Sequence, residues 1–138
     1  MHSRILVPVD LNNVEKLTKA LGIAARTAKE NDATVVYVGV VDAVPTSSAR
    51  SEVELMKELL DKFAAEQAKD HGIKTADQIT LRHDLHLHVG SEIISSAKEA
   101  DCDLIIMASH IPGIKDHIFS SNAGYVATHA PISVYVVR

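Results

Sequence analysis

The sequence predicts an α/β protein with one open, doubly wound sheet of five parallel strands and helices on both faces. Apolar, β-branched runs of strand length alternate with segments of helical periodicity along all 138 residues. The strand candidates are nearly continuous apolar runs, which is typical of parallel strands buried on both faces. With 46% hydrophobic residues and no internal repeat, we expect residues 1–138 to form a single domain.

Composition excludes several classes of protein. The chain contains 14 Lys and Arg residues and 18 Asp and Glu residues. Its net charge of −4 argues against a general nucleic-acid binder. Cys102 is the single cysteine, so no disulfide forms within the chain, and we expect it to be buried or half-buried rather than reactive. Because there is no signal peptide and no apolar run near 18 residues, we expect a cytoplasmic protein without membrane insertion.

The first strand candidate is Arg4 to Val9, in which Pro8 removes one ladder donor where pairing should end. A helix is expected to follow, capped by Asn12 or Asn13. Its apolar residues recur at helical spacing as far as a stop at Asn31-Asp32.

Thr34 to Val41 is rich in β-branched residues and predicts a second strand covered on both faces. Gly39 within it indicates the close approach of another group. After a loop, Ser51 and Glu54 form a capping-box pattern for a long helix, which is expected to end near Gly72.

The third strand candidate lies in the segment Gln78 to Val89, which ends in alternating apolar residues and histidines. Asp84, His86 and His88 then share one face as potential metal ligands. Side chains two residues apart on a strand are separated by about 6.5 to 7 Å, which is long for joint ligation of one ion. A solvated or helix-covered face is the preferred interpretation, and no metal site is predicted.

A short helix is expected from a cap at Ser91 to Ala100, followed by the buried fourth strand, Asp103 to Met107. This strand ends in Ala108-Ser109, small residues that leave room for a ligand.

The stretch from His110 to Ser120 has little periodicity and is predicted to be a functional loop. Ser120 to Asn122 supplies three candidate N-caps for a helix over Ala123 to His129. The free N–H groups of such a helix start attract phosphate. Pro131 ends the helix, and Ile132 to Val137 is the last strand candidate.

Four segments together resemble the universal stress protein family: ILVPVD, VVYVGVVD, a strand that ends in MASH, and NAGYVATHAPISVYVVR. Members of this family commonly carry Gly-x2-Gly-x9-Gly-Ser/Thr after the fourth strand. Here Ala108, Ile111 and Ser120 stand at the three glycines, and the loop is one residue shorter. The pattern Ala108-Ser109-His110-x-Pro112, followed by Ser121-Asn122, is similar to the short-loop branch that includes the enterobacterial F and G types.

The resemblance implies the adenine nucleotide alpha hydrolase-like sheet order 3-2-1-4-5. Its ligand crevice lies at the carboxyl ends of strands 1 and 4, where neighbouring connections leave in opposite directions. It also implies ATP, or else ADP or AMP, as the ligand, with Mg²⁺ accompanying ATP. The expected site residues are Pro8, Val9, Asp10, Val40, Met107, Ala108, Ser109, His110, Gly113, Ser120, Ser121 and Asn122.

Individual site residues have ordinary structural alternatives. Asp10 could accept hydrogen bonds from ribose or adenine, or it could belong to a turn. Val40 could contact the nucleoside and still be a core residue. Ser109, Gly113, Ser121 and Asn122 are expected at the phosphates by resemblance, and loop and capping chemistry also explains them. If the family glycine at Ser120 needs a positive φ, the Cβ adds strain of about 1 kcal/mol, so loss of triphosphate binding is an alternative.

The leading functional hypothesis is a nucleotide-dependent regulatory or stress-response protein. It is expected to be a homodimer through Ile132 to Val137, because this weakly charged run would otherwise be an exposed edge. The alternative is a nucleotide-free dimeric interaction module for a transporter or a metabolic enzyme. A third class is an enzyme of low turnover, although His110 and His117 belong to no recognisable catalytic pattern and no catalytic residue is predicted.

Overall fold

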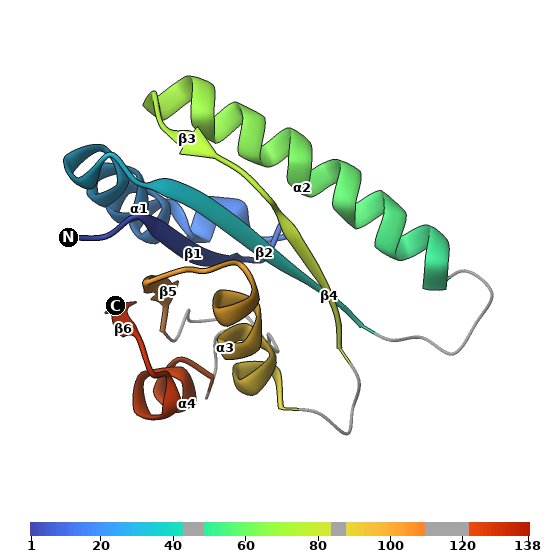
Figure 1. Cartoon of the computed structure of the whole chain (residues 1–138). Coiled ribbons are helices and arrows are strands. Elements are labelled where there is room, and N and C mark those ends of the chain that lie inside the picture. The colour runs from blue at the N-terminus through green and yellow to red at the C-terminus, as the bar shows by residue number, and fades with distance from the viewer. Residues whose placement is uncertain (43–48, 84–87, 110–121) are drawn as a thin grey trace.

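The computed structural model describes residues 1–42, 49–83, 88–109 and 122–138 (Figure 1). The strands are β1 (Arg4–Val9), β2 (Thr34–Asp42), β3 (Lys74–Thr75), β4 (Ile79–His83), β5 (Leu104–Ala108) and β6 (Ser133–Val137). The helices are α1 (Thr18–Asn31), α2 (Ala49–His71), α3 (Val89–Glu99) and α4 (Asn122–His129), and a 3-10 turn, η1 (Val14–Lys16), precedes α1.

All strands belong to one parallel sheet. Its order is β3-β2-β1-β5-β6, and β4 pairs with the same strand, β2, as β3 does. The segments β3 and β4 therefore form one row, and the predicted five-stranded order 3-2-1-4-5 is confirmed. Helices α1 and α2 lie on one side of the sheet, and α3 and α4 lie on the other (Figure 1). This arrangement follows from right-handed crossovers that leave the central strand in both directions.

A bulge separates β3 from β4. Between the two paired segments, the chain from β3 to β4 contains one residue more than the facing part of β2. Asp77 in the interruption has a φ of 52°, in the left-handed region that aspartate tolerates better than most residues. The side-chain oxygen of Gln78 accepts a hydrogen bond from the backbone N–H of Tyr37 at 3.0 Å. A side chain thus supplies the bond that the ladder loses at the bulge.

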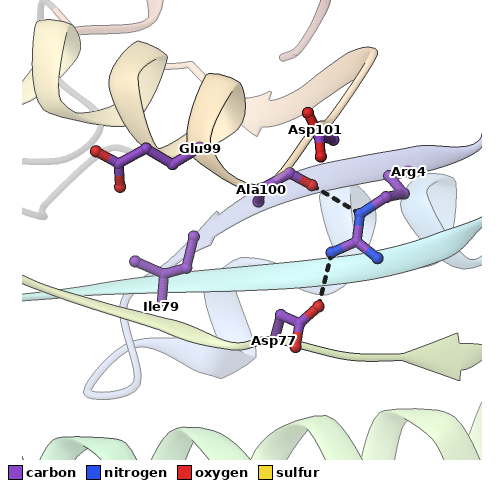
Figure 2. A pocket seen from close by; sticks show the side chains of 6 residues that line it. All are labelled: Arg4, Asp77, Ile79, Glu99, Ala100 and Asp101. Carbon is purple, nitrogen blue, oxygen red and sulfur yellow. Dashed lines mark hydrogen bonds and ion pairs between the residues drawn. The ribbon is translucent and has the colours of Figure 1, made fainter.

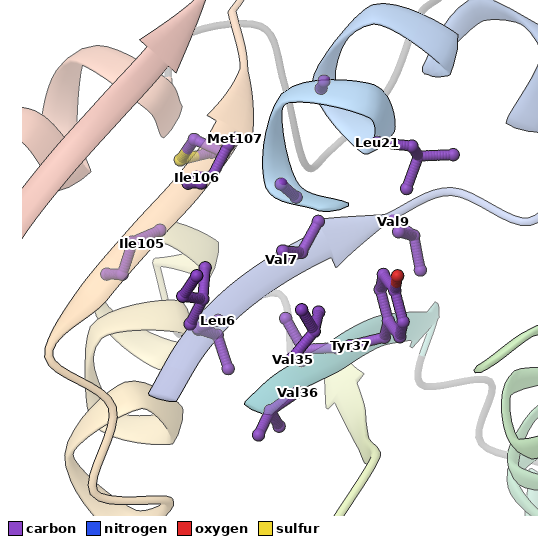
Figure 3. Close-up of a cluster of buried hydrophobic side chains, with 14 of the residues drawn as sticks. Leu6, Val7, Val9, Leu21, Val35, Val36, Tyr37, Ile105, Ile106 and Met107 are labelled. Atoms are coloured by element: carbon purple, nitrogen blue, oxygen red, sulfur yellow. The ribbon is translucent and has the colours of Figure 1, made fainter. Parts of the chain in front are cut away.

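The core is centred on the three middle strands. Figure 3 shows side chains from β1, β2 and β5 packed together, and Ile5, Leu6 and Val7 of β1 are almost completely buried. Helix α2 packs on β2 at Gly39, where a built Cβ would lie 3.4 Å from Sδ of Met56, an ordinary van der Waals distance. The packing of α2 therefore does not require a glycine at position 39.

Cys102 lies just before β5 and is buried, as expected from the sequence. Burial raises the pKa of its thiol to about 11, so it is protonated at neutral pH.

Two predicted helix starts are wrong. Helix α1 begins at Thr18 after η1, and Asn13 directs its side-chain amide to the carboxylate of Asp10 at 2.7 Å rather than capping a helix. Helix α2 begins at Ala49, so Ser51 lies inside the helix and is not its N-cap. Before α1, the chain enters the helix later than the polar cap signal indicates, because Asp10 and Asn13 bond to each other within the preceding turn.

The end of the predicted third strand is also wrong. His88 is the N-cap of α3, and its Nδ1 accepts a hydrogen bond from the N–H of Gly90 at 3.1 Å. Val89 is therefore helical, and Ser91 lies within the first turn of the helix, with its hydroxyl donating to the His88 carbonyl at 2.8 Å. Asp84 and His86 lie outside the described residues. The predicted strand extended too far at its carboxyl end because a histidine imidazole replaces the usual Ser or Asp cap.

Left-handed residues end three of the helices. Asp32 follows α1, Gly72 follows α2 and Asp101 follows α3, with φ values of 52°, 64° and 54°. The stops predicted near Asp32 and Gly72 are confirmed, and each positive φ reverses the chain towards the next strand.

The amino end of β1 is held by one carboxylate. Asp103 accepts hydrogen bonds from the backbone N–H groups of Ser3 at 2.8 Å and Arg4 at 3.3 Å, and its own N–H donates to the Arg4 carbonyl. Arg4 in turn donates from Nε to the carbonyl of Ala100 at 2.7 Å and pairs with Asp77 at 3.0 Å. These bonds join the chain segments that precede β1, β4 and β5.

We expect Asp103→Ala to lower the free energy of unfolding by about 1 to 3 kcal/mol, because it removes a charged acceptor from two backbone donors. Urea denaturation followed by circular dichroism measures this change. Asp70→Ala, on the exposed last turn of α2, is the control and is expected to change stability by less than about 0.5 kcal/mol. Equal losses in the two variants would contradict the role given to Asp103.

Tyr37 is fully buried on β2, with its ring edge-to-face on Phe63 at a centroid distance of 5.1 Å. Its hydroxyl has no hydrogen-bond partner within the described ranges. Burial raises the pKa of this phenol well above its ordinary value, because a phenolate there would be desolvated.

We expect Tyr37→Phe to raise the free energy of unfolding at pH 7 by about 1 kcal/mol, because a buried donor without a partner is removed. The raised pKa adds a pH dependence: the neutral phenol stabilises the fold below the unfolded pKa of about 10, and this contribution is lost as the pH rises further. Urea titrations from pH 7 to 11 should therefore show a steeper alkaline loss in the parent than in the variant. Parallel curves would refute the burial argument.

Candidate functional site

Asp10, Val40 and Ser109 come level with one another at the carboxyl edge of the sheet. Val9 of β1 is level with Gly39 of β2, so Asp10 is level with Val40. The β1–β5 pairs end at Leu6 with Ile105, and the same register continued four residues further makes Ser109 level with Asp10 on its other side. By register, Asp10, Val40 and Ser109 therefore form one row at the carboxyl edge of the sheet. This row is the place where the β1 and β5 connections diverge to opposite faces.

Asp10 organises the turn that leaves β1. Its carboxylate accepts hydrogen bonds from the backbone N–H of Asn12 at 2.9 Å and from the side-chain amide of Asn13 at 2.7 Å. Its carbonyl accepts a third bond, from the N–H of Asn13 at 3.1 Å. The turn interpretation of this aspartate is therefore confirmed. The same bonds hold the carboxylate at the sheet edge, which is the position that a ligand site needs.

Four of the expected site residues are core residues by their side chains. Val9 and Met107 are fully buried in the cluster of Figure 3, and Pro8 and Ala108 are buried beside them. They can present only backbone groups to a ligand, and Pro8 has no N–H to donate.

Val40 lies two residues before the end of β2, Ser109 directly follows β5, and both are partly buried. Val40 packs against the edge of the core, so its core interpretation holds. The N–H of Ser109 donates to the carbonyl of Val137 at 2.8 Å, which continues the β5–β6 pairing beyond the last residue of β5. This bond holds Ser109 at the carboxyl edge of the sheet.

Helix α4 begins at Asn122, one residue before the predicted start, and Asn122 is 7% exposed. The first residue of this helix is thus buried against the rest of the protein. His110, Gly113, Ser120 and Ser121, also expected at the site, lie outside the described residues.

A ring stack on α3 and α4 was not predicted. His88 lies 4.0 Å from Tyr125, and Tyr125 lies 4.1 Å from His129, measured between ring centroids. Gly90 makes room for this contact, because a Cβ there would lie 2.6 Å from the Tyr125 ring. The available signal was the i, i+4 spacing of Tyr125 and His129, which aligns their rings on one helix face. The stack fixes α4 against the start of α3.

A cavity of about 440 Å³ lies at the opposite, amino edge of the sheet (Figure 2). Arg4 lies within it, and its guanidinium is held by Asp77 and by the carbonyl of Ala100. Arg4 begins β1, and Asp77 and Ala100 precede β4 and β5, so the cavity is remote from the row at Asp10. We assign the Arg4 contacts to stabilising the connections rather than to the candidate site.

No cluster of three or more His, Cys, Asp or Glu residues suited to a metal ion occurs among the residues that the structure describes. Helices in these ranges also lack the combination of length and hydropathy that a bilayer span requires.

Comparison with known proteins gives consistent matches along the whole chain. The model of the universal stress protein family matches residues 1–138. Universal stress protein G of Salmonella typhimurium is 26% identical over 149 aligned residues, which cover both chains completely.

Solved structures also match nearly the whole chain. A universal stress protein from Archaeoglobus fulgidus in complex with dAMP has a TM-score of 0.71 and 21% identity, covering 99% of this chain and 98% of that one. A universal stress protein in complex with cAMP has a TM-score of 0.71 and 15% identity, covering 99% and 97%. The family match over every residue and the sheet order agree, and the chain belongs to the universal stress protein family.

Proposed function

We propose that this chain binds ATP or another adenine nucleotide in the crevice between the carboxyl ends of β1 and β5. The observation that carries the proposal is the row of Asp10, Val40 and Ser109 at the carboxyl edge of three adjacent strands. Helix α4, which begins at Asn122, is the next helix along the chain after β5. A topological switch point of this kind is where open α/β sheets bind ligands. All of residues 1–138 would act as one domain.

The two ends of the nucleotide have different partners in this proposal. The carboxylate of Asp10 can accept hydrogen bonds from ribose hydroxyls or from the adenine amino group, and Val40 offers an apolar contact to the nucleoside. Backbone N–H groups at the start of α4, with Ser121 and Asn122, meet phosphate. His110, Gly113 and Ser120 complete the phosphate end, and Mg²⁺ accompanies a bound triphosphate.

The relatives support an adenine nucleotide as the ligand class. The two solved complexes contain dAMP and cAMP, each of which has one phosphate group. Binding in such relatives therefore does not require a triphosphate. A Cβ at Ser120 that crowds the γ-phosphate would leave the nucleoside and first phosphate in place, so discrimination among ATP, ADP and AMP is the informative measurement.

We further propose a cytoplasmic homodimer whose contacts respond to the nucleotide. Strand β6 ends the sheet, and its Tyr135 is 48% exposed. Helix α4 runs into β6 through Pro131, so the helix that meets phosphate at its first turn also leads to the proposed dimer edge. Occupancy can thereby alter contacts with a partner such as a transporter or an enzyme. Hydrolysis has no assigned residue and is not part of the proposal.

The nucleotide site predicts distinct effects at its two ends. Asp10→Ala should weaken ATP, ADP and AMP alike, whereas Ser121→Ala should weaken ATP more than adenosine, because each charge-assisted bond contributes about 1.5 to 3 kcal/mol. The measurement is calorimetric titration of protein freed of ligand by denaturation and refolding. Chromatography of the small molecules released on denaturation identifies any nucleotide that copurifies.

The Ser120→Gly variant distinguishes steric crowding of the phosphates by the serine side chain from loss of the nucleotide site. If the serine only crowds the phosphates, the variant should bind ATP more tightly and adenosine with unchanged affinity. Glu30→Ala on the exposed end of α1 is the control, and should leave all affinities unchanged. If neither the parent nor Ser120→Gly releases nucleotide or gives heat with millimolar ATP and AMP, the nucleotide-free interaction module is the correct function.

The dimer proposal predicts that Val134→Lys shifts the protein towards the monomer, because it adds a charge to the face of an edge strand that a second copy would cover. Sedimentation velocity at micromolar concentration measures the mass. Lys57→Ala on the exposed side of α2 should leave it unchanged. A parent that stays monomeric, or a dimer that persists in the variant, would refute pairing through β6.

A further inference from the structure

A groove, separate from the Arg4 cavity, lies beside the β6 edge on the face of the sheet that carries α3 and α4. It has a volume of about 260 Å³. Its apolar lining comes from Ile94 and Ala97 of α3, from Cys102, and from Pro131 and Ile132 in front of β6. The groove therefore continues the sheet edge at the amino end of β6.

Two charged side chains complete the groove lining, Lys98 and Asp101. Both residues are exposed, and Asp101 follows α3 with a positive φ that turns the chain at this point. The groove is thus an apolar surface with one charge of each sign, and it suits a long side chain that has an apolar stem and a charged end.

Strand geometry determines what a second copy would bring to this groove. In an antiparallel pair across a twofold axis perpendicular to the sheet, directly opposed residues point to the same face. The register that pairs all five residues of β6 sets Tyr135 against its own symmetry mate and buries its exposed ring. In that register, residue 138 of the partner stands opposite Ile132.

The face of the sheet agrees with this placement. Ile132 lines the groove, and Arg138 lies an even number of residues further along the strand, so its side chain points to the same face. Lys19 of α1 donates to the backbone carbonyl of Arg138 at 2.6 Å. This bond holds residue 138 in line with β6 from the other face and leaves its exposed guanidinium for a partner.

We propose that the groove is the docking site for Arg138 of a second copy of this chain, with its stem on Ile132 and its guanidinium on Asp101. The proposal rests on the β6 homodimer and goes beyond it, because it adds a specific contact on each side of the twofold axis. The exposed carboxylate of Asp101 complements the guanidinium, and the exposed amine of Lys98 can turn to solvent. Each dimer contains two such contacts, one for each groove.

The test is a double-mutant cycle on the dimer. Sedimentation equilibrium gives the dissociation constant of the parent, Arg138→Ala, Asp101→Asn and the double variant. Asparagine is used because it tolerates the positive φ of residue 101. Each single change should raise the dissociation constant about tenfold, since two symmetric contacts are lost, and the double variant should be no weaker than the weaker single variant.

Asp32→Asn is the matched control, because Asp32 also ends a helix with a φ near 52° but lies after α1. It should leave the dissociation constant unchanged. Independent effects that add in the double variant, or single variants that equal the parent, would overturn the docking contact while the dimer itself stands. A parent that is monomeric throughout would overturn both proposals.

Cys102 provides a second measurement that depends on coverage of the groove. It is the single cysteine, and although its thiol is buried and protonated at neutral pH, it lines the groove, so its slow alkylation by N-ethylmaleimide at about pH 9 reports on this place alone. Docking of Arg138 predicts slower alkylation in the parent dimer than in Arg138→Ala at concentrations where both are dimers. Equal rates would count against the proposal even if the dissociation constants differ.

Discussion

The fold depends on complete burial of β1 between two parallel neighbours. Ile5, Leu6 and Val7 are almost inaccessible to solvent, and β2 and β5 pair with the two edges of this strand. Because both edges are occupied and both faces are covered by helices, polar chemistry at β1 is confined to its two ends. The protein uses one end for stabilising contacts and the other for the candidate ligand site.

The two ends differ in how their polar groups are used. At the amino end, Asp103 and Arg4 bond to backbone groups of neighbouring connections, and this network joins segments far apart in sequence. At the carboxyl end, Asp10 accepts hydrogen bonds from Asn12 and Asn13 in its own turn. This turn holds the carboxylate at the carboxyl edge of the sheet, where the registers of β1, β2 and β5 place it level with Val40 and Ser109.

Much of the fold was predictable because burial leaves a periodic record in the sequence. Strands β1, β2, β5 and β6 and the ends of α1 and α2 agree with the apolar runs and stop signals. The errors fall at helix starts. His88 caps α3 although histidine is not a usual cap, and the side chain of Asn13 bonds to Asp10 instead of a helix. At such positions several local hydrogen bonds compete with similar energies, and tertiary packing selects one.

Residue type and spacing are enough to predict the parallel α/β class, the family resemblance and the polar residues that follow strands 1 and 4. Which distant residues become neighbours is visible only in the folded chain. The register sets Asp10 beside Val40 and Ser109, and Gln78 reaches Tyr37 across a bulge. The fold also brings Cys102 and Ile132 together in the lining of one groove. Such neighbours depend on strand order and register, which arise when the whole core packs at once.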